Sequence, residues 1–154
     1  MQLSEFLDFD AIKPSMSGGN KRALLQQMAQ FAAGRLQVDV AEILSSISER
    51  ERLGSTGFGQ GVAIPHGKIE GLARIYGMFA RLSEPVDYKA IDGQPVDLVF
   101  LLLSPPDAGA EHLKALAAIS RVTRHAPTLE KMRGARSRDA LAAVLMGADE
   151  RDAA

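Results

Sequence analysis

The sequence predicts an α/β sandwich, and three observations carry this prediction. Apolar residues recur at helical spacing near both ends of the chain, whereas the middle contains short apolar runs rich in β-branched and aromatic residues. Gly, Pro and Asp separate these segments. Helices, then strands, then helices are typical of a sheet covered by helical layers. The 154 residues are enough for one domain, expected to span 1–154.

Two helices are expected before the central strands. The first starts near Gly18 and is expected to end at Gly34, while Asp39 is suited to cap a second helix whose C′ position falls on Gly54. A glycine-rich loop, residues 54–61, follows. The inward faces of the two helices are predicted to consist of Leu24, Leu25, Met28, Phe31 and Ala32, and of Val40, Ile43, Leu44 and Ile47.

Three strands are predicted in the middle of the chain. Residues 62–64 form a short one that Pro65 is expected to stop, and residues 74–82 form a longer one. Residues 96–103 are almost continuously apolar, which is typical of a central strand covered on both faces.

Three further helices are expected toward the C-terminus. The first covers residues 110–124, a short one lies near 129–133, and Ser137 is suited to cap the last. Residues 148–154 are predicted to be a frayed polar tail. The inward face of the 110–124 helix is predicted to carry Leu113, Leu116, Ala117 and either Ile119 or Ser120.

Composition excludes several classes of function. The formal net charge of −1 argues against a broad nucleic-acid-binding surface, and no apolar run approaches the ~20 residues that span a bilayer. The N-terminus lacks a signal peptide, so a cytoplasmic protein is expected. Without cysteine, there are no disulfides and no thiolate sites. His66, His112 and His125 remain as candidates for chemistry near neutral pH.

Residues 50–68 contain the densest cluster of glycines and charged side chains. A phosphate-binding P-loop fails on spacing, because Gly61 lies one residue too early for Gly67-Lys68 and Ile69 replaces the required Ser or Thr. A dinucleotide fingerprint also fails, since no strand precedes Gly57 and no helix follows. The cluster therefore contains neither of these nucleotide-binding motifs.

His66 and Arg50 are the stronger candidates within this cluster. His66 follows a short strand and Pro65, at the kind of strand end where α/β folds place sites, although a loop histidine without a role has comparable weight. Arg50 lies at the edge of an apolar helix face and needs an anionic partner. Periodicity favours a carboxylate, Glu49 or Glu51, over a phosphoryl group. Lys68 is most simply a solvated charge.

The other two histidines lie at the ends of the predicted 110–124 helix. His112 falls in the first turn, where the helix dipole holds an imidazole neutral, although alone it is more simply a half-exposed surface residue. His125 follows the last turn, where imidazoles ordinarily contact free carbonyls, and is interpreted as structural.

A family resemblance ties these residues together. Glu51, the pair Phe58-Gly59 and residues 62–67 resemble the phosphorylation-site motif of type-2 enzyme IIA domains, the mannitol/fructose class of the phosphoenolpyruvate-dependent phosphotransferase system. Residues 50–57 and 66–68 are most similar to the nitrogen-regulatory members of that family. The resemblance runs from residues 3–7 to residues 111–114, and nothing in the motif departs from the family pattern.

The resemblance implies a mixed β-sheet between layers of helices. It makes His66 the phosphoryl acceptor, Arg50 the guanidinium beside it and His112 a second active-site imidazole, with an apolar docking rim that includes Phe58. It implies no cofactor and no metal. The expected partners are an HPr- or NPr-like phosphocarrier protein and regulated targets, for which the family suggests potassium transport or sensor-kinase systems. Nucleic acid and membrane insertion are not expected.

Three functions follow from these observations. The leading hypothesis is a phosphoryl-carrier protein that regulates targets by phosphorylation-dependent binding. The alternative is the IIA component of a fructose/mannitol-type sugar transporter, which shares the first chemical step. An attached IIB or IIC segment would distinguish it, although free-standing sugar IIA proteins also exist in the family. A metal-dependent enzyme using His66, His112 and a carboxylate belongs to a different class, and no HExxH-like spacing supports it.

Overall fold

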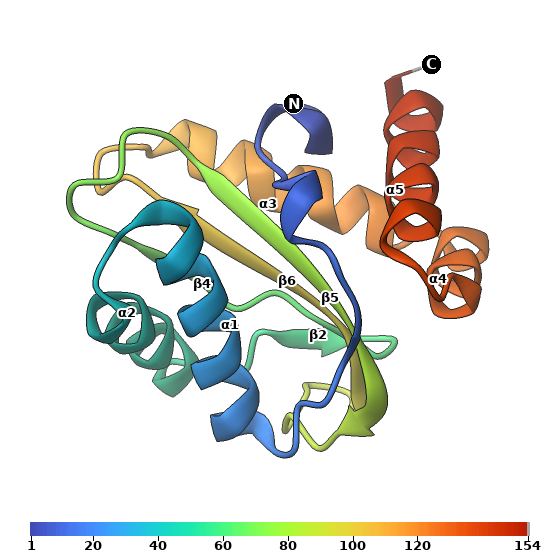
Figure 1. Cartoon of the computed structure of the whole chain (residues 1–154), viewed down its shortest axis with the longest axis horizontal. Coiled ribbons are helices and arrows are strands. Elements are labelled where there is room, and N and C mark those ends of the chain that lie inside the picture. Colours follow the sequence, from blue (N-terminus) through green and yellow to red (C-terminus); the bar gives the residue numbers. More distant parts are fainter. Residues whose placement is uncertain (154) are drawn as a thin grey trace.

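A mixed β-sheet of six strands forms the middle layer of this computed structural model, which describes residues 1–153 (Figure 1). The expected α/β sandwich is confirmed. The strands are β1 (Lys13–Met16), β2 (Gly57–Gly59), β3 (Val62–Ala63), β4 (His66–Lys68), β5 (Tyr76–Val86) and β6 (Val96–Ser104). The helices are α1 (Lys21–Leu36), α2 (Val40–Arg52), α3 (Ala110–Thr123), α4 (Ala126–Gly134) and α5 (Arg138–Ala153), and two 3-10 turns, η1 (Leu3–Glu5) and η2 (Phe9–Ala11), precede β1.

Strand β6 occupies the centre of the sheet, as its apolar sequence predicts. It pairs with β5 in antiparallel fashion and with both β3 and β4 in parallel, while β1 and β2 lie at the edges. Strands β1, β2 and β4 are missing from the sequence-based prediction, because each has only three or four residues and contains Gly or Pro. Pro65 does not terminate pairing: β3 ends before it, and β4 resumes beside β6 immediately after it.

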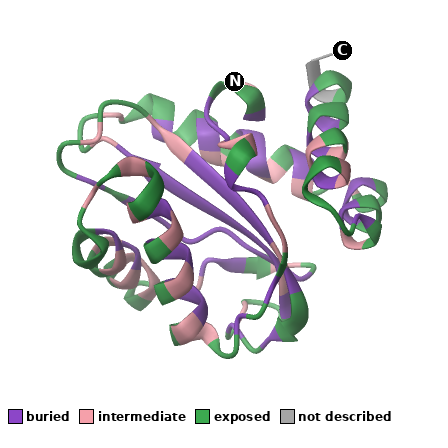
Figure 2. Cartoon of the chain, in the orientation of Figure 1, coloured by how far each residue is buried: buried purple, intermediate pink, exposed green. Residues whose placement is uncertain are grey.

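The side chains of β6 alternate between two separate hydrophobic cores. Leu98, Phe100 and Leu102 pack into one core with residues of α3, α4 and α5. Val99, Leu101 and Leu103 pack into the other core with residues of α1 and α2. Figure 2 shows β6 buried along its length between the two helical layers. The two helical layers therefore touch opposite faces of one buried strand.

Helix α1 runs two residues beyond the end predicted for it. Asn20 caps its N-terminus by accepting a hydrogen bond from the Ala23 amide at 2.8 Å. The helix continues through Gly34 and ends at Leu36, and the C-cap residue Gln37 adopts a left-handed φ of 57°. Gly34 is exposed, so the propensity cost of glycine inside a helix, about 1 kcal/mol, is small beside the packing of the buried face.

Helix α2 begins at the predicted N-cap. The Asp39 carboxylate accepts a hydrogen bond from the Ala41 amide at 3.0 Å, and Ile43 and Ile47 are fully buried. Val40 is exposed, because it lies in the first turn beyond the edge of the core. The helix ends at Arg52, and Gly54 occupies the C′ position with its amide bound to the Glu51 carbonyl.

The face that helix α3 presents to the sheet is only partly the predicted one: Ile119 is buried and Leu116 packs against the core, as expected. Leu113 and Ala117 are exposed, and the buried residues are His112, Ala115, Ala118, Ile119 and Val122. The prediction gave weight to the largest apolar side chains. The helix instead turns its small residues inward, which lets it approach the sheet closely, and this brings His112 into the interior.

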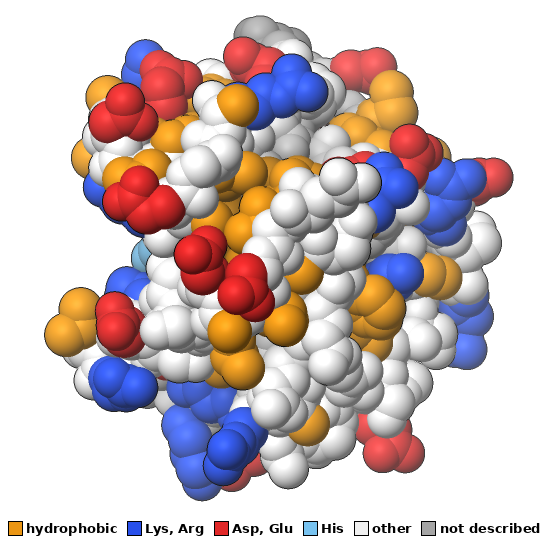
Figure 3. Space-filling model, turned by 60° about the vertical axis from the view of Figure 1, so that its left-hand side comes forward, with side chains coloured by type: hydrophobic (Ala, Val, Ile, Leu, Met, Phe, Trp, Pro, Cys, Tyr) orange, Lys and Arg blue, Asp and Glu red, His pale blue; other side chains and the backbone are white. Residues whose placement is uncertain are grey.

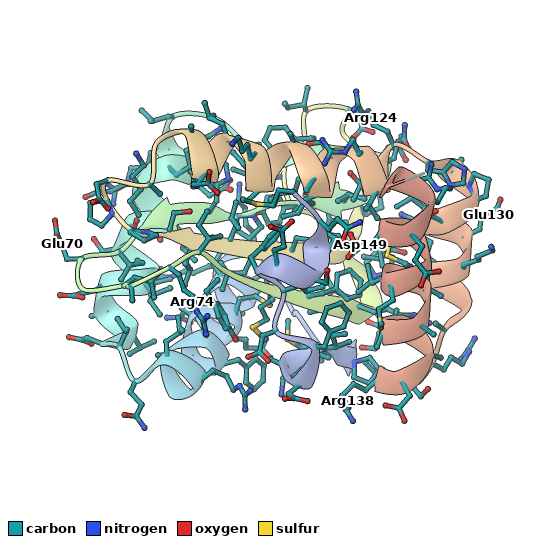
Figure 4. All side chains as sticks on the ribbon, turned by 90° about the horizontal axis from the view of Figure 1, so that it is seen from above. Glu70, Arg74, Arg124, Glu130, Arg138 and Asp149 are labelled. Atoms are coloured by element: carbon teal, nitrogen blue, oxygen red, sulfur yellow. The ribbon has the colours of Figure 1, made fainter. Side chains whose placement is uncertain are left out.

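The predicted frayed tail is helical as far as Ala153, and Ala154 lies outside the described residues. Ser137 caps α5 as expected, by accepting from the Ala140 amide at 3.1 Å. Asp149 is buried, and its two carboxylate oxygens accept hydrogen bonds from the amides of Leu3 at 2.7 Å and Ser4 at 2.9 Å (Figure 4). This contact joins η1 to the last helix. Among the described residues, no helix has the length and apolarity that a bilayer crossing requires.

Candidate functional site

A surface cavity of about 470 Å³ brings the three predicted site residues together. Arg50 comes from the last turn of α2, His66 from β4 and His112 from the first turn of α3. The cavity therefore draws on both helical layers and on the sheet between them. Its complete lining is Ser46, Glu49, Arg50, Leu53, His66, Gly67, Lys68 and His112. Figure 3 shows a histidine side chain that reaches the surface in a hollow at the left-hand edge.

A backbone carbonyl two residues before His66 holds its imidazole in one tautomer. Its Nδ1 lies 2.7 Å from the carbonyl oxygen of Ile64. A carbonyl can only accept, so Nδ1 carries the proton and Nε2 keeps its lone pair. Within residues 1–153, every buried side-chain nitrogen has a hydrogen-bond partner. Nε2 of His66 has no such partner, so it is not buried and is open to the cavity that His66 lines. His66 thus presents a free nucleophilic nitrogen.

The surroundings of His66 keep the ring neutral. Burial lowers the pKa of His66 below its ordinary value of 6.5, and the positive charge of Arg50 lowers it further. The hydrogen bond to Ile64 and the charge of Glu51 act in the opposite direction without reversing the shift. A neutral imidazole is the nucleophilic form, so His66 is in its reactive state near pH 7.

The guanidinium of Arg50 bonds to backbone rather than to a carboxylate. Its Nη1 donates to the carbonyl of Gly54 at 2.8 Å. The carboxylate partner predicted from periodicity is wrong: Glu51 pairs with Lys21 at 2.8 Å, and no ion pair of Arg50 occurs among the described residues. The remaining donors of Arg50 are thus available to an anion in the cavity.

His112 lies next to His66, with ring centroids 5.5 Å apart and planes inclined by 52°. Its Nδ1 is 2.6 Å from the hydroxyl oxygen of Ser104. Burial lowers the pKa of His112 to about 4, and the charges of His66 and Lys68 contribute. When the hydroxyl donates to Nδ1, Nε2 carries the proton and can donate to an anion. His112 is therefore neutral near pH 7, and in that tautomer it is a hydrogen-bond donor.

Ser104 is a site residue that sequence reasoning missed. It is fully buried at the end of β6, where its side chain falls on the same face as Leu102 and meets α3. The available signal was a single hydroxyl at the end of an otherwise apolar strand, eight residues before His112. A buried hydroxyl needs a hydrogen-bond partner, and His112 is the partner that it finds.

The other predicted residues lie in different settings. Lys68 is exposed at the cavity edge, in strand β4 rather than in a loop. His125 does not line the cavity; its Nδ1 lies 2.7 Å from the Thr128 hydroxyl at the start of α4. Phe58 is 48% exposed but is absent from the cavity lining. Leu53, 86% exposed, forms the apolar rim in its place.

The site combines a nucleophilic nitrogen, a fixed positive charge and a neutral hydrogen-bond donor. The first turn of α3 adds the positive end of a helix dipole on the side of His112. These groups suit nucleophilic attack by His66 on an electrophile. The product of the attack would carry a multiply charged anion on the nitrogen, as it does after phosphoryl transfer. Among residues 1–153, no group of three or more His, Asp or Glu side chains is arranged to hold a metal ion.

Comparison with known proteins gives consistent matches. Residues 5–147 match the sequence model of a family described as "Phosphoenolpyruvate-dependent sugar phosphotransferase system, EIIA 2". A "Nitrogen regulatory protein" from Bradyrhizobium diazoefficiens is 44% identical over 145 residues, which cover 94% of this chain and 95% of the relative. One of the same name from Pseudomonas aeruginosa is 38% identical, with 86% of each chain covered.

A solved structure matches along nearly the whole chain. The crystal structure of the nitrogen regulatory protein IIA-Ntr from Neisseria meningitidis superposes with a TM-score of 0.87 and 35% sequence identity. The match covers 93% of this chain and 98% of the other. The mixed sheet and its two helical layers are therefore shared with a nitrogen regulatory protein whose structure is solved.

Proposed function

Because the chain belongs to the EIIA type 2 family of the phosphoenolpyruvate-dependent sugar phosphotransferase system, we propose that it carries a phosphoryl group on His66. One observation carries the proposal: Nδ1 of His66 is bound to the Ile64 carbonyl, so the free nitrogen Nε2 faces the cavity. The donor is a phosphohistidine on an HPr- or NPr-like carrier protein.

In the proposed step, Nε2 of His66 attacks phosphorus in line with the nitrogen of the carrier. The new bond between phosphorus and Nε2 forms as the old phosphorus–nitrogen bond breaks, and the electron pair of the broken bond returns to the carrier's imidazole. The proton on Nδ1 stays in place. Since the ring of His66 becomes more positive as the bond forms, the Ile64 carbonyl stabilises it.

The arriving phosphoryl oxygens need compensating charge and hydrogen bonds. Arg50 supplies a positive charge, the N–H at Nε2 of His112 donates a hydrogen bond, and the first turn of α3 supplies its dipole. These groups are fixed before the reaction, so little reorganisation is needed when charge develops. Catalysis in this proposal is positioning and electrostatic stabilisation, without a general base, because His66 is already neutral.

An apolar rim is suited to dock the carrier. Leu53 lines the cavity and is 86% exposed, whereas Leu113 does not line it but follows the lining residue His112 in the chain and is 67% exposed. Exposed leucines beside a charged cavity are typical of a protein–protein contact with a polar centre. We assign this rim to the phosphocarrier and, in turn, to regulated targets.

The proposed output is regulatory. A phosphoryl group adds roughly two negative charges at neutral pH to a chain whose formal net charge is −1. The group would sit in a cavity bordered by exposed leucines, so it changes the docking surface directly. The relatives named nitrogen regulatory protein support this role over sugar transport.

The proposal is tested with phosphoenolpyruvate, the first enzyme of the system and a phosphocarrier, by following labelled phosphate. His66→Ala is expected to take up no label while its thermal unfolding stays close to that of the wild type. His125→Ala is the matched control, since His125 lies outside the cavity, and is expected to label normally. Full labelling of His66→Ala, or none of the wild type, would refute the proposal.

A further inference from the structure

The carboxylate of Glu51 is the centre of a buried hydrogen-bond network beside the site. Only 7% of its side chain is exposed, and it receives the Lys21 ammonium at 2.8 Å, the Tyr88 hydroxyl at 3.0 Å, and both the amide and the hydroxyl of Thr56. The Lys21 ammonium also lies 4.4 Å above the Tyr88 ring centroid. Glu51 does not line the cavity.

One branch of this network leads to His66. The Thr56 carbonyl accepts a hydrogen bond from the Ile64 amide at 2.9 Å, and the Ile64 carbonyl accepts from Nδ1 of His66 at 2.7 Å. Three consecutive hydrogen bonds therefore join the Glu51 carboxylate to the ring of His66. Because the Ile64 carbonyl also selects the tautomer of His66, a displacement of Thr56 changes which nitrogen is free.

The other branch leads to Arg50. Residues 53–56 fold back over the end of α2, with the Gly54 amide on the Glu51 carbonyl and the Thr56 amide on the Glu51 carboxylate. Glu51 thus fixes this segment close to both of its ends. The Gly54 carbonyl in between holds the guanidinium of Arg50 at 2.8 Å. The position of that carbonyl, and hence of Arg50, depends on Glu51.

We infer that Glu51 is a positioning residue that sets both the tautomer and ring position of His66 and the place of the Arg50 guanidinium. The inference rests on the proposed function. It gives a physical role to a residue that periodicity offered, together with Glu49, as a carboxylate partner of Arg50, and that the resemblance included in the motif without a stated role. Lys21 is a necessary part of the network around Glu51, because an unpaired carboxylate would be too costly to bury at this position.

Glu51→Gln is the variant that tests this role most directly. It preserves size but removes the charge that pairs with Lys21, and its amide nitrogen cannot accept a bond from Thr56. Since positional errors of about 1 Å in a site cost up to ~100-fold in rate, we expect kcat for labelling of His66 to fall about 10- to 100-fold. The KM for the carrier is expected to stay within about twofold, because the exposed rim is untouched.

Two further variants complete the experiment. Tyr88→Phe removes one donor to Glu51 and keeps the buried ring, so a smaller loss of about threefold in kcat is expected, and this variant still decides the matter if Glu51→Gln folds poorly. Glu42→Gln, an exposed carboxylate on the same helix, is the matched control and is expected to be unchanged.

A spectroscopic readout separates positioning from general destabilisation. Long-range ¹H–¹⁵N spectra report which imidazole nitrogen of His66 carries the proton. We expect protonated Nδ1 in the wild type and in Glu42→Gln, and a mixture of tautomers in Glu51→Gln. Wild-type kcat and an unchanged tautomer in folded Glu51→Gln or Tyr88→Phe would overturn the inference. Failure of the wild type to label would overturn the proposed function instead, and the spectra would still test Glu51.

Discussion

Gly67 lies so close to Ser46 that a side chain at this position would collide with helix α2. A β-carbon built on Gly67 would be 2.3 Å from the Ser46 hydroxyl oxygen and 3.2 Å from its backbone carbonyl carbon. The same hydroxyl donates to the Lys68 carbonyl at 2.9 Å. Strand β4 and α2 are therefore in direct contact where they contribute His66 and Arg50 to the cavity.

Gly67→Ala is expected to push α2 away from β4. The free energy of unfolding should fall by about 1–3 kcal/mol, as for other overpacked positions, and labelling of His66 should slow because Arg50 moves with the helix. Urea denaturation and single-turnover labelling measure the two effects. Gly147→Ala is the control, because its β-carbon would meet no atom of another element within 4 Å; since Gly147 lies inside α5, this variant is expected to be slightly more stable than the wild type and to label normally. Adding Ser46→Gly should recover part of the loss; no recovery would mean that the contact with Ser46 is not the cause.

Arg50→Lys is expected to lower kcat for labelling by about 100-fold, comparable to the loss of one preorganised donor in other active sites. Lysine retains the charge but cannot hold the Gly54 carbonyl and a phosphoryl oxygen with one planar group. Rapid-quench labelling gives kcat and KM separately. Arg52→Lys, on an exposed neighbour in the same turn, should behave as wild type. Equal activity of Arg50→Lys and wild type would remove Arg50 from the mechanism.

His66 should remain an active phosphoryl acceptor at a pH at which a histidine of ordinary pKa is already mostly protonated. Since burial lowers the pKa of His66 below 6.5, more than half of the rings are neutral at pH 6.5, and half-protonation is reached only at lower pH. The single-turnover rate at pH 6.5 should therefore still exceed half of its value at pH 8, and it should decline as the pH falls through the lowered pKa. NMR titration of the free protein checks the shift independently. A midpoint for His66 above 6.5 would contradict this prediction.

Leu113→Ser is expected to raise the KM for the carrier severalfold without changing kcat or stability. Its side chain is 67% exposed, so removing it costs the fold little but takes apolar area from the proposed docking rim. Steady-state labelling at several carrier concentrations measures the effect. Met146→Ser on α5, also more than half exposed, is the matched control. A KM that rises equally in both variants would show that this rim is not the docking surface.

Asp149→Ala is expected to destabilise the protein by about 1–3 kcal/mol, because the buried amide of Leu3 loses its acceptor. Labelling of His66 should be unaffected, since Asp149 does not line the cavity. Urea denaturation measures the change, with Glu150→Ala, its exposed neighbour on α5, as control. A stability equal to that of Glu150→Ala would mean that the contact contributes nothing.

Much of the fold could be predicted because local signals and tertiary packing agree. The apolar run of β6 and the Asp39 and Ser137 caps each specify local structure that the fold retains. The inward face of α3 could not be predicted in the same way. Apolar size favoured Leu113, whereas close packing on the sheet selects the small residues beside His112.

The structure brings the three residues predicted for the site to one cavity, whereas the contacts that hold them there could not be predicted. The motif around His66 is local in sequence, so its residues could be identified from a resemblance. The contacts of Glu51 with Lys21 and Tyr88, and of His112 with Ser104, connect separate elements in space. No periodicity reports such pairs, and the carboxylate partner proposed for Arg50 was wrong for this reason.

The hydrogen bonds between Asp149 and the N-terminal residues Leu3 and Ser4 affect how far this chain can be shortened. The family match spans residues 5–147, yet the carboxylate at 149 and the amides at 3 and 4 both lie outside those limits and bond to each other across 146 residues. A chain shortened to the matched range would lack both the donors and the acceptor of these hydrogen bonds. It would also leave the apolar side chains that Leu3 contacts open to water. A chain shortened to residues 5–147 is therefore expected to be less stable than the whole chain, because it lacks the Asp149 carboxylate and the amides of residues 3 and 4.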